Sequence, residues 1–495
     1  MPEHVRTSRR TFIFLGALAA VIPKRLRAQS TRARRPQFQT TPQLEVPPVP
    51  AAWTSPTARL VRRATMGLTA TDLASARKLG YQGWLNQQLK YTRITDGLVA
   101  TAVAGLYPQL AMGVDQLYQA DTGTVTSVLQ QATIYRAAFS QRQLFERMVE
   151  FWSDHLNIYV GKVGYLKIVD DREVIRKHAL GRVSSLIAAS SKSPAMLAYL
   201  DQTQSRAGRP NQNYARELME LHTLGVDGGY TQNDVAELSR VLTGWTSSGR
   251  GVFYFDPNGH DWEAKTVLGM TIPASTPAVG QDGVKEGEAV IRMLVSHPST
   301  ANFISRKMIA WLLNAEPTTS QVRTISAVYR STGGDISAMV RAILNDAWVA
   351  AAPAKFKRPF HYLVSGVRAL GASATNTIAL NQQLASIGQG LFLWETPDGY
   401  PDRIEYWAGN ITPRWSFAGV LSAYKTPPIA VDATPFMTAG ADGTIETINQ
   451  RIFGGEISPA TRVGLNGYLA AGTYNETRVR ETMGLAVAGS DFQWY

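Results

Sequence analysis

The 495-residue sequence contains no cysteine, and this absence excludes several kinds of site at once. Disulfides, iron–sulfur clusters, thiolate zinc centres, blue-copper centres and cysteine nucleophiles all need a sulfur that the chain does not have. Histidine is scarce as well, with seven residues. The fold must therefore be stabilised by packing, and any acid–base or metal site must be built from carboxylates and a few histidines.

Long apolar runs are missing too. The run Phe12–Ile22 has 11 residues, whereas a membrane-spanning helix needs about 20. Arg9 and Arg10 precede this run, and Lys24 follows it. This order is typical of a twin-arginine signal peptide, so we assign residues 1–28 to it and expect a periplasmic or secreted protein without a transmembrane segment. The alternative is a surface helix or a basic arm that binds a partner.

Most of the positive charge lies outside the predicted folded body. The whole chain carries a formal charge of +12, of which residues 1–28 contribute +5 and Arg32, Arg34 and Arg35 three more. The remaining +4 is ordinary for a body of this size, so the charge does not predict a nucleic-acid partner. Residues 29–50 are rich in Arg, Thr, Gln and Pro, which indicates a linker.

Helical periodicity dominates the rest of the chain and predicts a mainly α, multi-helix body. Capping residues and apolar spacing favour helices at 73–89, 143–156, 171–189, 213–224, 298–313 and 336–344, and a further helix that begins after Thr231. Residues 251–273 differ, because two short β-rich runs flank an Asp-Pro-Asn-Gly turn; we expect a small β-hairpin or an ordered loop there. We expect the helical body to span 51–430, with a C-terminal extension, 431–495, packed on it.

Three of these helical segments carry polar residues among apolar ones. Glu146, Glu150 and Asp154 recur every four residues and share one helix face, and His155 follows directly. The second segment carries Arg176 and His178, and the third carries Arg216, Glu217 and His222. Glu217 shares a stripe with two leucines, which predicts a carboxylate turned into the core, where it is costly unless paired or coordinated.

Two interpretations of these segments remain open. In the first, they converge between helices: Glu150, Glu217 and His222 serve as acid–base groups with Arg176 and Arg216 orienting carboxylates or binding an anion, or His155, His178, Glu217 and His222 hold a divalent metal. In the second, they are buried Arg–Glu pairs and hydrogen-bonded histidines that fix helix packing. The spacing is not that of a di-iron carboxylate site, and it names no cofactor.

Several stretches together give the chain a family resemblance. They are Ala58–Thr65, Glu146–Asn157, Arg172–Gly181, Met196–Asp201, Asn211–Thr246, His260-Asp261, Lys265–Gly269 and Pro397–Pro401. The chain resembles the bacterial domain-of-unknown-function 1800 family over about residues 55–425. The resemblance implies an exported protein, often encoded beside a phosphatase-like exported protein, and it assigns no catalytic residue.

Three functions follow as hypotheses. The first is a periplasmic or secreted hydrolase, with or without a metal, that acts on a polar or polymeric extracellular substrate; Trp152, Trp245 and Trp394 are candidates for stacking on a sugar. The second is a metal-dependent oxidoreductase built on the same carboxylates and histidines. The third is a non-enzymatic binding or assembly partner of the phosphatase-like protein.

Overall fold

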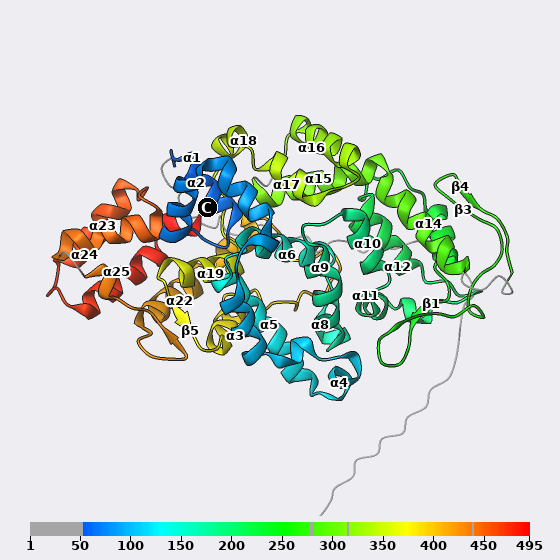
Figure 1. Cartoon of the computed structure of the whole chain (residues 1–495), viewed down its shortest axis with the longest axis horizontal. Helices are drawn as coiled ribbons and strands as arrows, with labels where there is room; N and C mark the ends of the chain where they lie inside the picture. The colour runs from blue at the N-terminus through cyan, green and yellow to red at the C-terminus, as the bar shows by residue number, and fades with distance from the viewer. Residues whose placement is uncertain (1–52, 277–281, 314–315, 438–439) are drawn as a thin grey trace, which may run out of the picture. The chain divides into compact units, whose positions relative to one another are not determined.

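The computed structural model describes residues 53–276, 282–313, 316–437 and 440–495, all of which belong to one unit, Glu45–Tyr495 (Figure 1). The predicted signal peptide (1–28) and linker (29–50) lie outside the described residues, and the division of the body at residue 430 stays a prediction. None of the helices in the described ranges is both long and apolar enough to cross a membrane.

The mainly α prediction is confirmed. The first helices are α1 (Pro56–Ala64), α2 (Ala70–Leu89), α3 (Gly97–Leu106), α4 (Val114–Gln119), α5 (Thr122–Phe139), α6 (Gln143–His155), α7 (Val160–Val163), α8 (Leu166–Asp170), α9 (Arg176–His178), α10 (Val183–Ser191), α11 (Pro194–Tyr199), α12 (Gln212–Glu217) and α13 (Gln232–Val241). The later ones are α14 (Asp282–Ser296), α15 (Pro298–Leu312), α16 (Thr319–Thr332), α17 (Ile336–Ile343), α18 (Asp346–Ala351), α19 (Pro359–Ala369), α20 (Ile378–Ser386), α21 (Ile404–Trp407), α22 (Ile411–Ala423), α23 (Gly440–Phe453), α24 (Pro459–Ala470) and α25 (Glu476–Ala488).

Shorter turns connect these helices. The 3₁₀ turns are η1 (Tyr91–Arg93), η2 (Pro108–Ala111), η4 (Gln202–Gln204), η7 (Ala408–Asn410), η8 (Thr434–Phe436) and η9 (Ser490–Gln493). Two turns are π-helical, η3 (Asp171–Ile175) and η5 (Leu218–Thr223). Single π turns inside helices occur frequently at functional sites, and both of these fall in segments that the sequence singles out.

The predicted β insertion forms two small hairpins instead of one. β2 (Phe253–Phe255) pairs antiparallel with β1 (Trp245–Ser247), and β3 (Lys265–Val267) pairs with β4 (Met270–Ile272). The two β-rich runs therefore do not pair with each other across the Asp-Pro-Asn-Gly turn. Each one belongs to its own hairpin. A third pair, β5 (Ser373–Ala374) with β6 (Ile429–Ala430), lies elsewhere in the chain.

Local capping signals explain several helix starts. Thr69, Thr231, His297 and Asp335 each accept a hydrogen bond from a backbone N–H in the first turn of the helix that follows. The predicted helix 171–189 is wrong as a single element, because it is interrupted between α9 and α10. There Val183 N–H donates to Gly334 O, and Ile336 N–H donates to Gly181 O, so this backbone pairs with a distant segment instead of continuing the helix.

Two large apolar clusters form the interior. One gathers side chains of α1, α2, α6, α10, α15 and α17; the other gathers side chains of α5, α19, α20, α22, α23 and α25. Helix α6 packs against α1, α2, α5 and η3. Its carboxylates and His155 are therefore held at a junction of the fold.

Candidate functional site

The C-terminal half of α6 carries a buried carboxylate, Glu150, and a part-buried one, Asp154, that share one arginine. Arg358, which precedes α19, contacts Glu150 Oε1 at 3.0 Å and Asp154 Oδ2 at 2.6 Å. Arg147 contacts the other oxygen of Glu150 at 3.2 Å. Burial raises the pKa of both carboxyl groups, and Arg358 offsets part of that shift. Glu150 thus lies between two arginines, an arrangement that holds a carboxylate in place.

A histidine pair continues this cluster. His155 Nε2 lies 3.2 Å from the carbonyl oxygen of His222, and the two ring centroids are 6.4 Å apart. Burial, with the nearby Lys307, lowers the pKa of His155 and lowers that of His222 to about 3. Both rings are therefore neutral at neutral pH. His155 Nδ1 and His222 Nε2 have no hydrogen-bond partner within the described residues.

Lys307 on α15 is a member of the cluster that the sequence analysis missed. Burial lowers its pKa to about 8, and the carboxylates of Asp154 and Asp398 oppose that shift. The ammonium group lies 5.6 Å from the centre of the Phe303 ring. The sequence feature that could have identified Lys307 is its spacing. It lies four residues after Phe303 and four before the buried Trp311, on an aromatic helix face.

A loop with a tightly packed glycine covers the end of α6. Asn157 Nδ2 donates to the carbonyl oxygens of Trp394 (3.0 Å) and Thr396 (2.7 Å). Asp398 Oδ1 accepts hydrogen bonds from the side chains of the same two residues. Gly399 has a φ of +75°, and a Cβ placed on it would lie 2.2 Å from the carbonyl oxygen of Asp154. This position therefore requires glycine for both conformation and contact.

Glu217 lines an open groove of about 460 Å³ beside this loop. Burial raises the pKa of Glu217 to about 7, with further contributions from the negative charges of Glu220 and Asp398 and an opposing one from Arg216. Tyr159, Tyr199, Asn213 and Glu395 share the lining. Lys162 Nζ, at the same groove, donates to Asp201 Oδ1 at 2.8 Å and to Tyr199 O at 2.7 Å.

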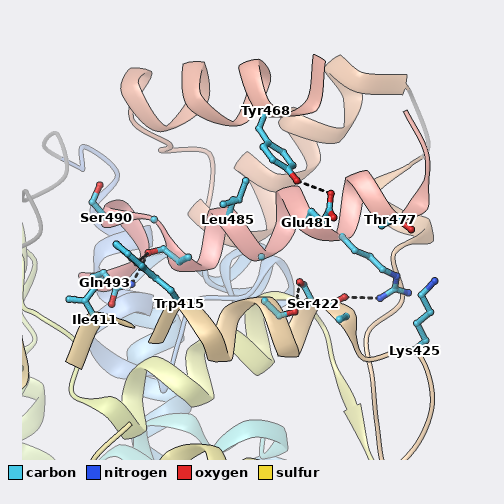
Figure 2. A pocket seen from close by; sticks show the side chains of 16 residues that line it. Ile411, Trp415, Ser422, Lys425, Tyr468, Thr477, Glu481, Leu485, Ser490 and Gln493 are labelled. Atoms are coloured by element: carbon cyan, nitrogen blue, oxygen red, sulfur yellow. Dashed lines mark hydrogen bonds between the residues drawn. The ribbon is translucent and has the colours of Figure 1, made fainter. Parts of the chain in front are cut away.

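A larger hollow than this groove lies elsewhere, between α22, α24 and α25 (Figure 2). It measures about 1040 Å³, and Trp415 and Leu485 contribute exposed apolar surface, 56% and 42% of each residue. Two of its charged residues already have partners: Arg480 donates to Glu476 Oε1 and to three carbonyl oxygens, and Glu481 accepts a hydrogen bond from Tyr468 OH. The predicted site residues are not part of its lining.

Comparison with known proteins gives one match. A family model described as a protein of unknown function (DUF1800) matches residues 59–494, nearly the whole described chain. The chain belongs to the DUF1800 family. The match extends beyond the 55–425 range of the resemblance noted above and includes α23, α24 and α25. No curated protein and no solved structure matches the chain.

In this DUF1800 chain, part of the predicted site comes together. Glu150 is linked through Arg358 to Asp154, Asp154 and Asp398 act on Lys307, and Asp398 in turn acts on Glu217. The positive charge of the same lysine lowers the pKa of His155 and His222. The ion pairs of Arg358 and these longer-range electrostatic interactions relate four of the predicted residues, Glu150, His155, Glu217 and His222. Their roles stay predictions.

The other predicted residues lie in different surroundings. Arg176 contacts Glu146, and both are close to Arg136 and Asp171. His178 is half-buried on α9, where burial and Lys177 lower its pKa, and it shows no contact with the other predicted residues. Arg216 donates to Gln232 at 2.8 Å. Among the tryptophans, Trp152 and Trp245 are fully buried and Trp394 is partly exposed near the Glu217 groove.

The donor set does not fit a metal ion. The oxygens of Glu150 contact two arginines, and His155 Nε2 lies against a backbone carbonyl. Across the described ranges, no three His, Asp or Glu side chains are placed as a group that could hold a metal. We therefore derive no step through a metal for this family member.

Replacing Gly399 by alanine is expected to destabilise the protein by about 2–5 kcal/mol, because the new Cβ meets the Asp154 carbonyl in a left-handed backbone conformation. Thermal unfolding of the variant measures this loss. Gly229→Ala is the matched control: Gly229 has a φ of +84° but nothing within 4 Å of an added Cβ, so its cost is about 1–2 kcal/mol. Equal losses in the two variants would contradict the proposed contact.

Proposed function

We propose that this protein is an exported glycoside hydrolase that acts on a polar extracellular polysaccharide, with Glu217 as the general acid. The observation that carries the proposal is the pKa of Glu217, about 7, at an open groove of about 460 Å³. A carboxylic acid whose pKa is raised to this range keeps a substantial protonated fraction near neutral pH and can protonate a leaving-group oxygen.

Glu395 is the second carboxylate of the proposed mechanism. It lines the same groove, and its exposed side chain has no hydrogen bond or ion pair with the described residues. Hydrolysis of a glycosidic bond needs one protonated and one ionised carboxyl group on the two sides of the bond. Tyr159, which is partly exposed at the groove, provides aromatic surface for a sugar ring.

The buried cluster behind the groove has a positioning role in this proposal. Lys307 acts electrostatically on Asp398, and the negative charge of Asp398 helps to raise the pKa of Glu217. Glu150, His155, His222 and Arg358 fix the end of α6, on which the loop carrying Glu395 and Asp398 rests. Arg216 moderates the pKa of Glu217, whereas Arg176 holds Glu146 on the far part of α6.

The pH dependence of activity tests the proposal. Activity, measured as release of reducing ends from a panel of soluble neutral and anionic polysaccharides, is expected to fall as the pH rises through about 7, where Glu217 loses its proton. Glu220→Gln removes a negative charge that raises this pKa, so the basic limb of the profile should move to lower pH. An unchanged limb in the variant would remove Glu217 from the acid role.

Export by the twin-arginine route is part of the proposal. Arg9→Lys/Arg10→Lys is expected to abolish export, because the route recognises the arginine pair and not merely its charge. Cell fractionation and immunoblotting should find the precursor in the cytoplasm. The control is Arg34→Lys/Arg35→Lys, an identical change in the linker, which should be exported normally. Normal export of the first variant would contradict the assignment.

The oxidoreductase hypothesis and the binding-partner hypothesis are not supported by a comparable structural feature of the described residues. A metal-dependent oxidoreductase needs a ligand group that the described side chains do not form. The binding role with a phosphatase-like protein has an exposed apolar groove available at α22 and α25, but nothing in the described structure indicates what covers it (Figure 2).

A further inference from the structure

A second cavity, of about 340 Å³, shares no lining residue with the Glu217 groove. Three aromatic side chains form an apolar part of its wall, Phe356, Trp407 and Trp494. Phe356 and Trp494 face each other across an antiparallel bridge, with ring centroids 5.3 Å apart. Pro353 and Arg403 are exposed at its rim, so solvent reaches it. The volume is at the small end of ligand pockets, suited to a compact molecule.

The lining also carries hydrogen-bond donors without acceptors. Trp494 and Arg358 are 8% and 4% exposed, and Trp494 Nε1 and Arg358 Nε have no hydrogen-bond partner in the described structure. A buried donor left without an acceptor destabilises the fold. Such groups are rare in folded proteins, and each needs an explanation. Two of them in the lining of one cavity indicate a ligand that accepts hydrogen bonds.

Charge specifies the ligand further. Lys355, Arg358 and Arg403 line the cavity together with two carboxylates, Asp402 and Glu316. Arg358 is paired with Glu150 and Asp154, which lie outside the lining. Lys355 is used internally, because its ammonium contacts Asp402 and the carbonyl oxygens of two residues of α15. The side chain of Arg403, in contrast, makes no hydrogen bond or ion pair with the described residues. An exposed guanidinium at the rim favours a carboxylate, which it can bind through two hydrogen bonds.

We propose that this cavity binds a small carboxylate carried on a ring. The ring packs against Phe356 and the two tryptophans, and the carboxylate accepts hydrogen bonds from Arg403 at the rim and from the buried donors of Trp494 and Arg358. This site goes beyond the hydrolase proposal and does not depend on it. Ring carboxylates of two sources share this chemistry, aromatic acids and sugar acids.

Calorimetric titration of the full mature chain with benzoate and with glucuronate tests the site. Benzamide and glucose serve as the neutral counterparts. The ligand that fits is expected to bind at least about 10-fold more tightly as the carboxylate than as its neutral counterpart, because hydrogen bonds to a charged group are the stronger ones. Binding of benzoate assigns an aromatic acid, and binding of glucuronate assigns a sugar acid. Binding of neither at millimolar concentration overturns the proposal.

Two variants locate the binding. Arg403→Gln is expected to weaken the bound carboxylate about 10-fold, and Trp494→Phe, which keeps a ring but removes the Nε1 donor, about 5–10-fold. Arg323→Gln on α16 is the control, since Arg323 is also exposed and without a partner among the described residues but does not line the cavity. Unchanged affinity in Arg403→Gln overturns the site even where Trp494→Phe fails to fold, because Arg403 is exposed and its loss leaves the core intact.

Discussion

Replacing Glu217 by glutamine is expected to lower kcat on the polysaccharide substrate by about 10²–10⁴-fold, the usual contribution of a general acid. Glutamine keeps the size and hydrogen-bonding shape of the side chain but has no proton to give. Because the carboxyl group acts on the chemical step, KM should change little. The measurement is a steady-state assay of reducing-end release at pH 6, below the pKa of about 7 for Glu217.

Two further variants frame this result. Glu395→Gln is expected to cause a loss of similar size, because it removes the second carboxylate of the pair. Glu263→Gln is the matched control, since Glu263 is exposed, has no side-chain contact in the described ranges and does not line the groove, and it should keep full activity. Full activity in Glu217→Gln would exclude Glu217 from the mechanism.

The same variant has a stability effect that is independent of activity. The pKa of Glu217 is raised in the folded state, so between about pH 4.5 and 7 the folded chain binds more protons than the unfolded chain. Stability is therefore lost as the pH rises through this window. Glu217→Gln removes that loss. At pH 8 its free energy of unfolding should exceed that of the parent by on the order of 1 kcal/mol after solvent screening, so it should unfold at a higher temperature. At pH 4 the two proteins should unfold at the same temperature.

The elements that the sequence predicts correctly depend on local chemistry. Thr69, Thr231, His297 and Asp335 mark helix starts because the cap is a contact within a few residues of chain. The interruption before α10 is different. It exists because Gly181 and Val183 pair with backbone near residue 335, more than 150 residues away, and no local pattern records that contact. The strand pairings in 245–272 were missed for a related reason, since either neighbour satisfies the β pattern.

In the candidate site, too, some residues could be predicted from local sequence and others could not. Glu217 could be found from the sequence because a carboxylate on an apolar helix stripe is unusual wherever the helix packs, and Glu150 because it shares one helix face with Glu146 and Asp154. The partners of these two carboxylates could not be predicted from the sequence. Arg358 lies 208 residues from Glu150, and Glu395 and Asp398 lie on a loop whose position depends on hydrogen bonds from Asn157. Which carboxylate faces a groove and which is held between arginines is decided by tertiary structure alone.

Arg358→Met is expected to be the most destabilising substitution in the site, with a loss of about 3–5 kcal/mol. Arg358 is 4% exposed and contacts Glu150 Oε1 and Asp154 Oδ2, and its guanidinium lies 4.8 Å from the centre of the Trp311 ring. Methionine retains the apolar contacts of the side chain but leaves the buried Glu150 and the part-buried Asp154 with less compensating charge. Urea unfolding at pH 7 measures the change.

The cause can be separated from a general packing defect by a double-mutant cycle. If uncompensated charge is responsible, Arg358→Met/Glu150→Gln should be more stable than Arg358→Met alone. The loss of stability in Arg358→Met should also shrink at pH 4 to 5. Protonation there neutralises carboxyl groups whose pKa is already raised by burial. Arg250→Met is the control: Arg250 contacts Asp115 at 3.0 Å, but both side chains are exposed, so its loss should stay below about 1 kcal/mol. A loss of stability in Arg358→Met that is independent of both pH and Glu150 would show that Arg358 stabilises the fold through packing. The end of α6 would then be positioned by Asn157 and Gly399, without a contribution from the ion pairs of Arg358.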